Sequence, residues 1–101
     1  MNELIQNNID EIRQLCREHD VEKLYVFGSV AGGGFSDRSD IDFLVKFKDI
    51  PFDRYTDNYF VLRGLFENFF NRKVDLLTEK SLSNPYLIKM IDQTKTLLYE
   101  G

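Results

Sequence analysis

A glycine–serine pair and two nearby aspartates are the residues of this sequence best suited to chemistry. Gly28 and Ser29 follow a short apolar run, and Asp40 and Asp42 stand at the start of a second one. Side chains alternate between the two faces of a strand, so aspartates two positions apart point to the same side. Their charges repel each other unless a cation neutralises them. A divalent metal ion is the simplest such cation.

Gly28 and Ser29 form a candidate phosphate-binding corner. Backbone N–H groups that converge after a strand can hold a phosphate. Gly28 lets the phosphate approach the backbone, and the Ser29 hydroxyl can donate a hydrogen bond. Hard carboxylate oxygens suit Mg²⁺ or Mn²⁺, which bridge carboxylates to substrate phosphates.

Asp75 is a candidate third carboxylate, because it interrupts the apolar run 73–78. It joins Asp40 and Asp42 if its strand lies beside theirs. Three carboxylates can hold two metal ions, one on the attacking oxygen and one on the phosphates. The combination predicts in-line nucleotidyl transfer. Each motif alone is weak evidence for this chemistry, since an isolated Asp-x-Asp or Gly-Ser is common in ordinary hairpins and turns.

The pattern of apolar residues predicts a domain of the α/β (α+β) class, with a small mixed sheet of three to four strands and helices mainly on one face. Strands are expected over 22–27, 41–47 and 73–78, and helices over 3–18, about 56–70 and about 81–93. Within the last range the helix is expected to start near Asn84 and Pro85, since proline suits a first helical position. A short helical turn from Ser29, weakened by three glycines at 32–34, leads through the loop 35–39 to the second strand. The segment 96–99 is either a closing strand or more helix.

Length and composition describe one domain over residues 1–101, with a formal net charge of −4. This charge argues against direct binding of nucleic acid, which normally needs a basic face. Cys16 falls on the apolar side of the first helix and is expected to be a small buried hydrophobe. The sequence has neither a membrane-spanning run nor a signal-peptide pattern, so the expected location is the cytoplasm.

The predicted helix 56–70 carries more aromatic residues than one apolar stripe requires, including Tyr59 and Phe60. They either thicken the core under a small sheet or form a face for a partner. Gly64, in the middle of this helix, is disfavoured there by about 1 kcal/mol relative to alanine. Close packing against the sheet would explain it.

The spacing of these residues resembles a known family. Gly-Ser, ten residues, then Asp-x-Asp is similar to the signature of the DNA polymerase β-like nucleotidyltransferase superfamily, and segments 27–31 and 39–45 resemble its minimal nucleotidyltransferase (MNT) branch. The resemblance implies a nucleotidyltransferase (polymerase β palm-like) fold. It assigns the triphosphate of ATP or another NTP to Gly28 and Ser29. It assigns two Mg²⁺ ions, with Mn²⁺ as a substitute, to Asp40, Asp42 and Asp75, and Asp75 is also its candidate for activating the acceptor hydroxyl.

The resemblance also implies a partner. Minimal nucleotidyltransferases often act as antitoxins beside a helical HEPN-type toxin, and some transfer AMP from ATP to a tyrosine of that toxin. The sequence leaves open whether the chain also forms a homo-oligomer. One departure is Gly32, which stands where many relatives have an arginine. It motivates a rival hypothesis, in which the chain has little or no catalytic activity and neutralises its partner by binding alone.

Overall fold

The fold is an open four-stranded sheet with helices on both sides, described by a computed structural model for residues 2–36 and 38–101. Asp37, in the expected loop 35–39, lies outside the described residues. The elements in chain order are α1 (Glu3–Gln6), α2 (Ile9–Glu18), β1 (Val21–Phe27), α3 (Ser29–Gly32), β2 (Ile41–Phe47), α4 (Phe52–Phe70), β3 (Val74–Thr78), the 3₁₀ turn η1 (Glu79–Ser81), α5 (Pro85–Thr94) and β4 (Thr96–Glu100).

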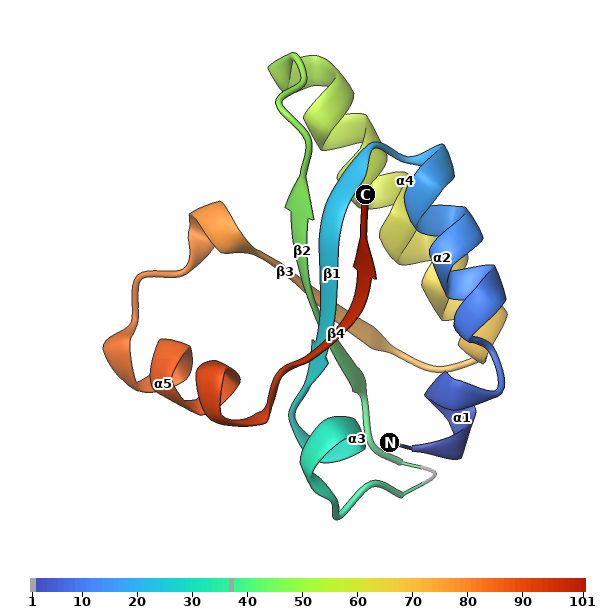
Figure 1. Cartoon of the computed structure of the whole chain (residues 1–101), viewed down its shortest axis with the longest axis vertical. Helices are drawn as coiled ribbons and strands as arrows, with labels where there is room; N and C mark the ends of the chain where they lie inside the picture. Colours follow the sequence, from blue (N-terminus) through green and yellow to red (C-terminus); the bar gives the residue numbers. More distant parts are fainter. Residues whose placement is uncertain (1, 37) are drawn as a thin grey trace.

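The strands lie in the order β3-β2-β1-β4, as Figure 1 shows. β1 is antiparallel to both of its neighbours, whereas β2 and β3 run parallel. Parallel neighbours need a long crossover connection, and α4 supplies it. The predicted α/β class and mixed sheet are therefore confirmed, and the segment left open becomes the edge strand β4.

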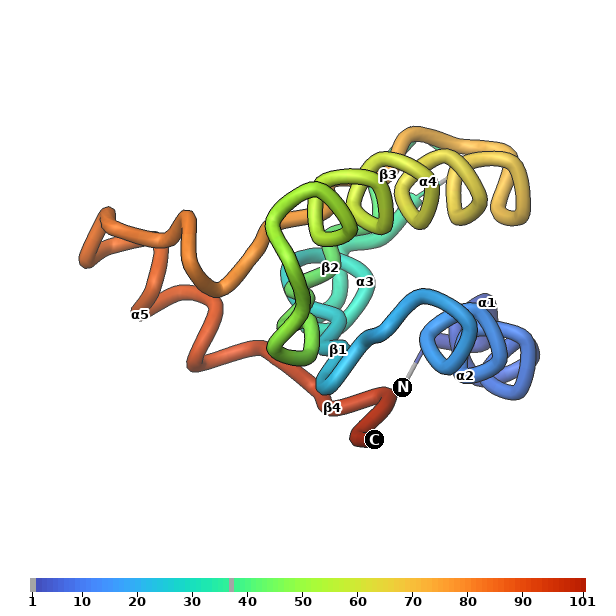
Figure 2. The backbone as a smooth tube through the Cα atoms, turned by 90° about the horizontal axis from the view of Figure 1, so that it is seen from above, coloured from blue at the N-terminus to red at the C-terminus, as the bar shows by residue number. Residues whose placement is uncertain are grey.

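The two faces of the sheet are covered unequally. Figure 2 shows α1, α2 and α4 on one side and α5 alone on the other. The first side holds the main core, whose largest fully buried side chains include Phe43 and Phe66. The second side has a smaller cluster in which Phe27 and Leu44 of the sheet contact Ile91 of α5. Helices lie mainly on one face, as predicted, and this leaves much of the other face open for chemistry.

The expected first helix is in fact two helices, because residues 7 and 8 form a turn between α1 and α2. The Asn8 side chain donates to the Leu4 carbonyl at 2.7 Å, and side-chain bonds of this kind compete with the helix. Asn2 caps α1 by accepting from the Leu4 N–H at 2.7 Å. Cys16 is fully buried, as predicted, and burial raises the pKa of its thiol to about 12.

The long helix α4 begins at Phe52, four residues before the predicted start at Thr56. Pro51 precedes it, and its carbonyl accepts from the Tyr55 N–H at 2.9 Å, which closes the first turn. The last helix begins where expected, because Pro85 takes its first position and the Asn84 side chain accepts from the Tyr86 N–H at 2.9 Å. Proline and asparagine are favourable at these positions.

The aromatic residues of α4 divide between core and surface. Phe66 and Phe70 are buried, and Phe43 stacks on Phe66 with their ring centroids 4.8 Å apart. Phe52 and Phe60, by contrast, are 83% and 56% exposed. The core hypothesis for the surplus aromatics therefore holds for the buried rings, and a partner face stays a prediction for the exposed ones. Among the described residues, no helix has the length and apolar character that a membrane crossing requires.

The hypothesis that Gly64 marks close packing is wrong. A Cβ atom placed on Gly64 meets no atom of the other described residues within 4 Å. Its position in the middle of α4 therefore costs helix stability without a compensating contact.

We predict that Gly64→Ala raises the free energy of unfolding by about 0.5–1 kcal/mol, since alanine is the better helix former and the site has room for the methyl group. Urea unfolding measures this change. Gly33→Ala is the matched control, because Gly33 has equal room but a φ of 105°, which L residues rarely adopt. That variant should lose stability, and equal effects of the two substitutions would contradict the prediction.

Candidate active site

Gly28 forms a tight corner between β1 and the short helix α3. Its φ is 74°, and its carbonyl accepts from the Gly32 N–H at 2.8 Å to begin the helical turn. A Cβ atom at Gly28 would contact Oδ2 of Asp42. Only glycine permits both this backbone conformation and this close approach. The corner and the carboxylate of β2, predicted separately from the sequence, are therefore in direct contact.

Asp42 and Asp75 occupy matching positions on neighbouring strands. In the register of the sheet, Asp42 lies opposite Phe27 of β1 and beside Asp75 of β3. Both side chains point to the open face, because their neighbours in sequence face the main core. Burial, together with the charges of Asp75 and Asp40, raises the pKa of the Asp42 carboxyl from 3.8 to about 6.

Asp40 lies near this pair but also faces a cation. Its Oδ2 is 3.8 Å from Nζ of Lys73, the residue before β3. The Ile41 N–H donates to the Lys73 carbonyl at 3.2 Å, which fixes the two segments side by side. Lys73 was not identified from the sequence, since a single exposed lysine carries no signal without the strand register that places it here.

The carboxylates provide the hard oxygen donors that Mg²⁺ prefers. Within residues 2–36 and 38–101, no three His, Cys, Asp or Glu side chains already enclose a metal-sized site. The mutual repulsion that raises the pKa of Asp42 is nonetheless the repulsion that a bound cation relieves. The donor set thus fits a divalent ion, and the contact of Asp40 with Lys73 competes with it.

The family comparison identifies the origin of this arrangement. The family model described as "Polymerase beta, Nucleotidyltransferase" matches residues 10–101. The chain belongs to the minimal nucleotidyltransferases of the polymerase β-like family. A protein of Methanocaldococcus jannaschii named "Putative protein adenylyltransferase MJ1379" is 33% identical over 93 residues, which cover 84% of this chain and 92% of the relative.

Solved structures agree with this minimal nucleotidyltransferase fold. One, of a "putative minimal nucleotidyltransferase", has a TM-score of 0.69 at 26% identity and covers 95% of both chains. A chain from a toxin–antitoxin crystal structure with AMP-PNP has a TM-score of 0.74 at 24% identity, over 93% of this chain and 74% of that one. A chain from tri-AMPylated Shewanella oneidensis HEPN toxin in complex with MNT antitoxin has a TM-score of 0.67 at 22% identity, over 95% of this chain and 72% of that one.

Thr94 is a residue of this nucleotidyltransferase site that sequence reasoning missed. It ends α5, and its Oγ1 accepts from the Gly28 N–H at 3.3 Å and donates to the Met90 carbonyl at 3.1 Å. A Cβ atom at Gly32 would lie 3.6 Å from Cγ2 of Thr94, an ordinary contact. The last turn of α5 therefore holds the corner in place. No local motif marks this threonine, because it is 66 residues from Gly28.

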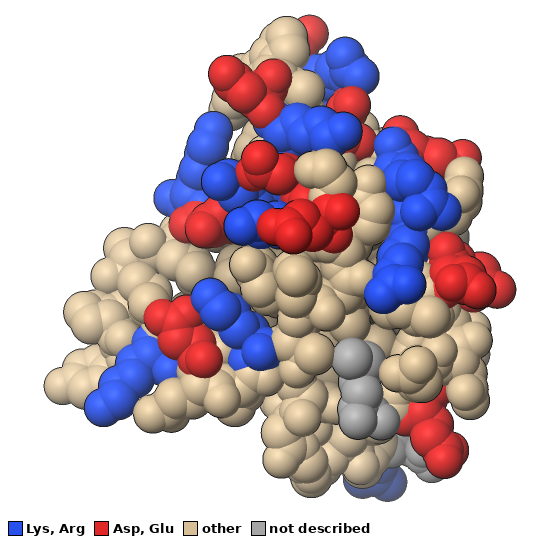
Figure 3. Space-filling model, in the orientation of Figure 1, with Lys and Arg blue, Asp and Glu red and all other residues tan. Residues whose placement is uncertain are grey.

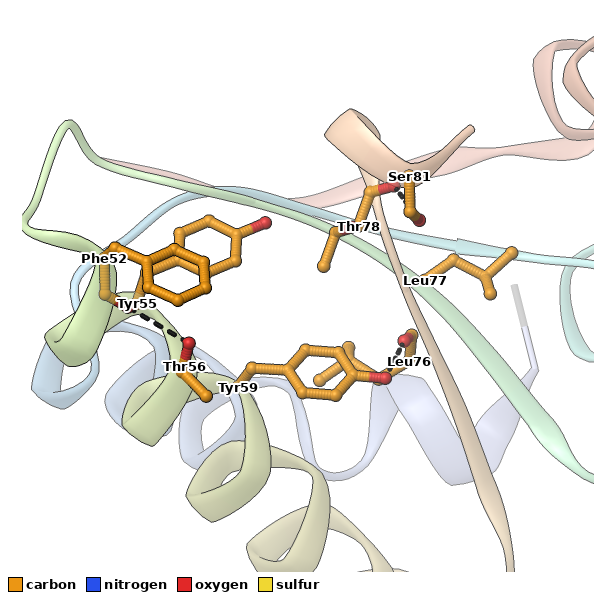
Figure 4. A pocket seen from close by; sticks show the side chains of 8 residues that line it. All are labelled: Phe52, Tyr55, Thr56, Tyr59, Leu76, Leu77, Thr78 and Ser81. Carbon is orange, nitrogen blue, oxygen red and sulfur yellow. Dashed lines mark hydrogen bonds between the residues drawn. The ribbon is translucent and has the colours of Figure 1, made fainter. Parts of the chain in front are cut away.

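Two hollows of the surface follow β3. The one drawn in Figure 4 has a volume of about 290 Å³ and lies between α4 and β3. Another of similar volume includes Asp75 and Lys73 in its lining. In the described part of the face drawn in Figure 3, basic and acidic side chains are interspersed. Ion pairs join some of the chain's charges, such as Lys46 and Glu22 at 3.1 Å.

We predict that Asp42→Asn stabilises the metal-free protein at neutral pH. The folded-state pKa of about 6 lies above the ordinary 3.8. The folded state therefore binds the proton more tightly, and this contribution to stability is lost as pH rises through 6. With the partial exposure of the pair taken into account, we expect a gain of about 4 °C in the unfolding midpoint at pH 7.5.

Thermal unfolding in EDTA from pH 4 to pH 8 tests this sign. The gain should shrink below pH 6 and vanish near pH 4, where wild-type Asp42 is protonated. Asp57→Asn, which changes an exposed aspartate of α4, should follow the wild type throughout. A gain of equal size at pH 4 and pH 8 would contradict the role given to repulsion.

We predict that Thr94→Val weakens nucleotide binding about fivefold, the effect of one hydrogen bond of roughly 1 kcal/mol. Calorimetry with AMP-PNP and Mg²⁺ measures it, with urea unfolding as a check on the fold. Thr94→Ser keeps the hydroxyl and should restore wild-type affinity. If valine and serine weaken binding equally, the hydrogen bond to Gly28 is not what positions the corner.

Proposed function

We propose that this chain is an Mg²⁺-dependent nucleotidyltransferase that transfers AMP from ATP to a hydroxyl group of a protein acceptor. The observation that carries the proposal is the placement of Asp42 between the Gly28 corner and Asp75 on adjacent strands. The names of the M. jannaschii relatives, which refer to protein adenylyltransferases, support AMP as the transferred group.

Each residue has a role in this proposal. Gly28 would let the triphosphate approach the backbone closely, and Ser29 would bind it through its backbone N–H and its hydroxyl. Asp40, Asp42 and Asp75 hold Mg²⁺, with Mn²⁺ as a substitute. Two bound ions would neutralise the charge that develops on the phosphates and on the attacking oxygen. Lys73 pairs with Asp40 when the metal is not bound.

The reaction balances as an in-line displacement. The acceptor oxygen forms a bond to the α-phosphorus of ATP, and the bond from that phosphorus to the bridging oxygen of the β-phosphate breaks. Pyrophosphate leaves with the bonding electrons, and the hydroxyl proton passes to the Asp75 carboxylate. Asp75 is exposed, so an incoming acceptor can reach it. Positioning and charge stabilisation account for the catalysis.

The proposed partner is a helical HEPN-type toxin, for which this chain would be the antitoxin. Support comes from the matched structures, which include a toxin–antitoxin pair with AMP-PNP and the S. oneidensis HEPN toxin with its MNT antitoxin. Such a pair using ATP would work in the cytoplasm. The acceptor hydroxyl would then belong to the toxin.

Gly32 favours a second candidate function, neutralisation of the toxin by binding alone. Many relatives have an arginine here, and the guanidinium would add charge beside the phosphates. The described part of the chain leaves room for a side chain at Gly32, since among its residues only Thr94 lies within 4 Å of a Cβ atom there. The absence of the arginine is therefore not imposed by packing. Measured AMP transfer decides between the two functions.

We predict that the wild type, with Mg²⁺ and α-labelled ATP, transfers label to the HEPN-type protein encoded beside it. Asp42→Asn should lower the rate at least 100-fold, because it removes a metal-binding charge from the centre of the site. Asp57→Asn, an exposed aspartate on α4, is the matched control and should retain wild-type activity.

Transfer that survives Asp42→Asn unchanged would refute the proposed site. No transfer by the wild type, together with tight toxin binding that Asp42→Asn does not alter, would favour neutralisation by binding alone.

A further inference from the structure

The proposed donor and acceptor sides of the reaction lie on opposite sides of Asp42. The sheet order places the corner of β1 on one side of β2 and Asp75 of β3 on the other. ATP held at Gly28 therefore occupies the β1 side. An acceptor can reach Asp75 from β3, which is one of the two edges of the sheet. What lies at that edge determines which acceptors can bind.

A continuous groove runs along this edge. Its first hollow contains Asp75 and Tyr59, and Tyr59 and Leu77 also line the second hollow, drawn in Figure 4. A third, of about 360 Å³, continues it through Phe52, Tyr55 and Ser81. We call this the β3 groove. It begins beside Asp75, whose carboxylate points to the neighbouring open face, and follows β3 towards the start of α4.

We propose that the β3 groove binds an extended segment of the acceptor polypeptide and places its hydroxyl-bearing residue at Asp75. This inference rests on the proposed function and extends it to the recognition of the acceptor. The five residues of β3 span about 16 Å, so an extended segment of similar length would fill the groove.

The chain's own side chains hinder the binding of the segment as an added strand. Along β3, three outward backbone groups have side-chain partners. The Val74 N–H donates to Glu67, the Tyr59 hydroxyl donates to the Leu76 carbonyl, and the Ser81 hydroxyl donates to the Thr78 carbonyl. Their donor–acceptor distances are 3.1, 2.8 and 2.9 Å. We therefore expect recognition to rely mainly on side chains of the acceptor.

The lining of the groove specifies the side chains that fit. Phe52 lies at the far end of the groove, beside the half-buried ring of Tyr55, and is 83% exposed. An aliphatic or aromatic side chain of the acceptor would bury both rings. The Lys80 ammonium lies 5.3 Å from the centre of the Tyr55 ring and forms no ion pair with any described residue. It suits an acidic residue, although Glu79 shares its wall.

A peptide selection tests the proposal. The probe is a phage library of random 12-residue peptides with one fixed tyrosine, selected on the wild-type chain with AMP-PNP and Mg²⁺. Selected sequences are synthesised, and their Kd is measured for Phe52→Ala and Lys80→Glu. The matched controls are Tyr86→Ala and Lys89→Glu, which make the same changes on α5. Tyr86 is 86% exposed, about as much as Phe52.

We expect both groove variants to weaken peptide binding at least fivefold. The two controls should stay within twofold of the wild type, and all four variants should bind AMP-PNP normally. Labelled ATP should modify the tyrosine of the peptide, and Phe52→Ala should raise the KM for the peptide with little change in kcat. These variants change exposed side chains, so their effects do not arise from loss of the fold.

Three results would overturn the inference. The first is that the selected peptides bind Phe52→Ala and Lys80→Glu as tightly as the wild type, or that the control variants weaken peptide binding as much as the groove variants do. The second is transfer to the toxin that the groove variants leave unchanged. The third is that a 12-nucleotide RNA binds the groove in place of peptides. Failure of the proposed function differs from all of these, since no probe would then receive label even where groove-dependent peptide binding is intact.

Discussion

The contact between the Gly28 backbone and the Asp42 carboxylate is the constraint on which the rest of the site depends. It brings a charged group against the end of β1, and it is possible only because Gly28 has no side chain. The pairing of β1 with β2 sets the contact, and the parallel pairing of β2 with β3 then brings Asp75 beside Asp42. Three segments far apart in the sequence thus meet at one point of the open face.

This arrangement carries an electrostatic cost. The folded chain buries Asp42 and holds carboxylates close to it, and both the burial and the resulting repulsion raise the pKa of Asp42. Lys73 offsets part of it from the side of Asp40. A sequence under selection for stability alone would have an amide or an apolar side chain at position 42. Strain of this kind is typical of sites whose ligands bring compensating charge.

The strands, the corner and the candidate carboxylates could be predicted from the sequence, because each depends on local patterns. β2 has the predicted bounds, and α5 begins at the predicted proline. The features that could not be predicted depend on register or on competition between weak interactions. The break at Asn8 reflects a side-chain hydrogen bond that competes with the helix. Thr94 and Lys73 reach the site only through the packing of α5 and the alignment of β3.

The two edges of the sheet share a property that matters beyond catalysis. On β3 three outward backbone groups bond to Glu67, Tyr59 and Ser81, and on β4 the Leu98 carbonyl accepts from Arg13 at 3.0 Å. Exposed sheet edges are the usual starting points of strand-to-strand aggregation. Each backbone group that bonds to the chain's own side chains is one fewer available to a strand of another molecule. These contacts therefore work against self-association through the sheet.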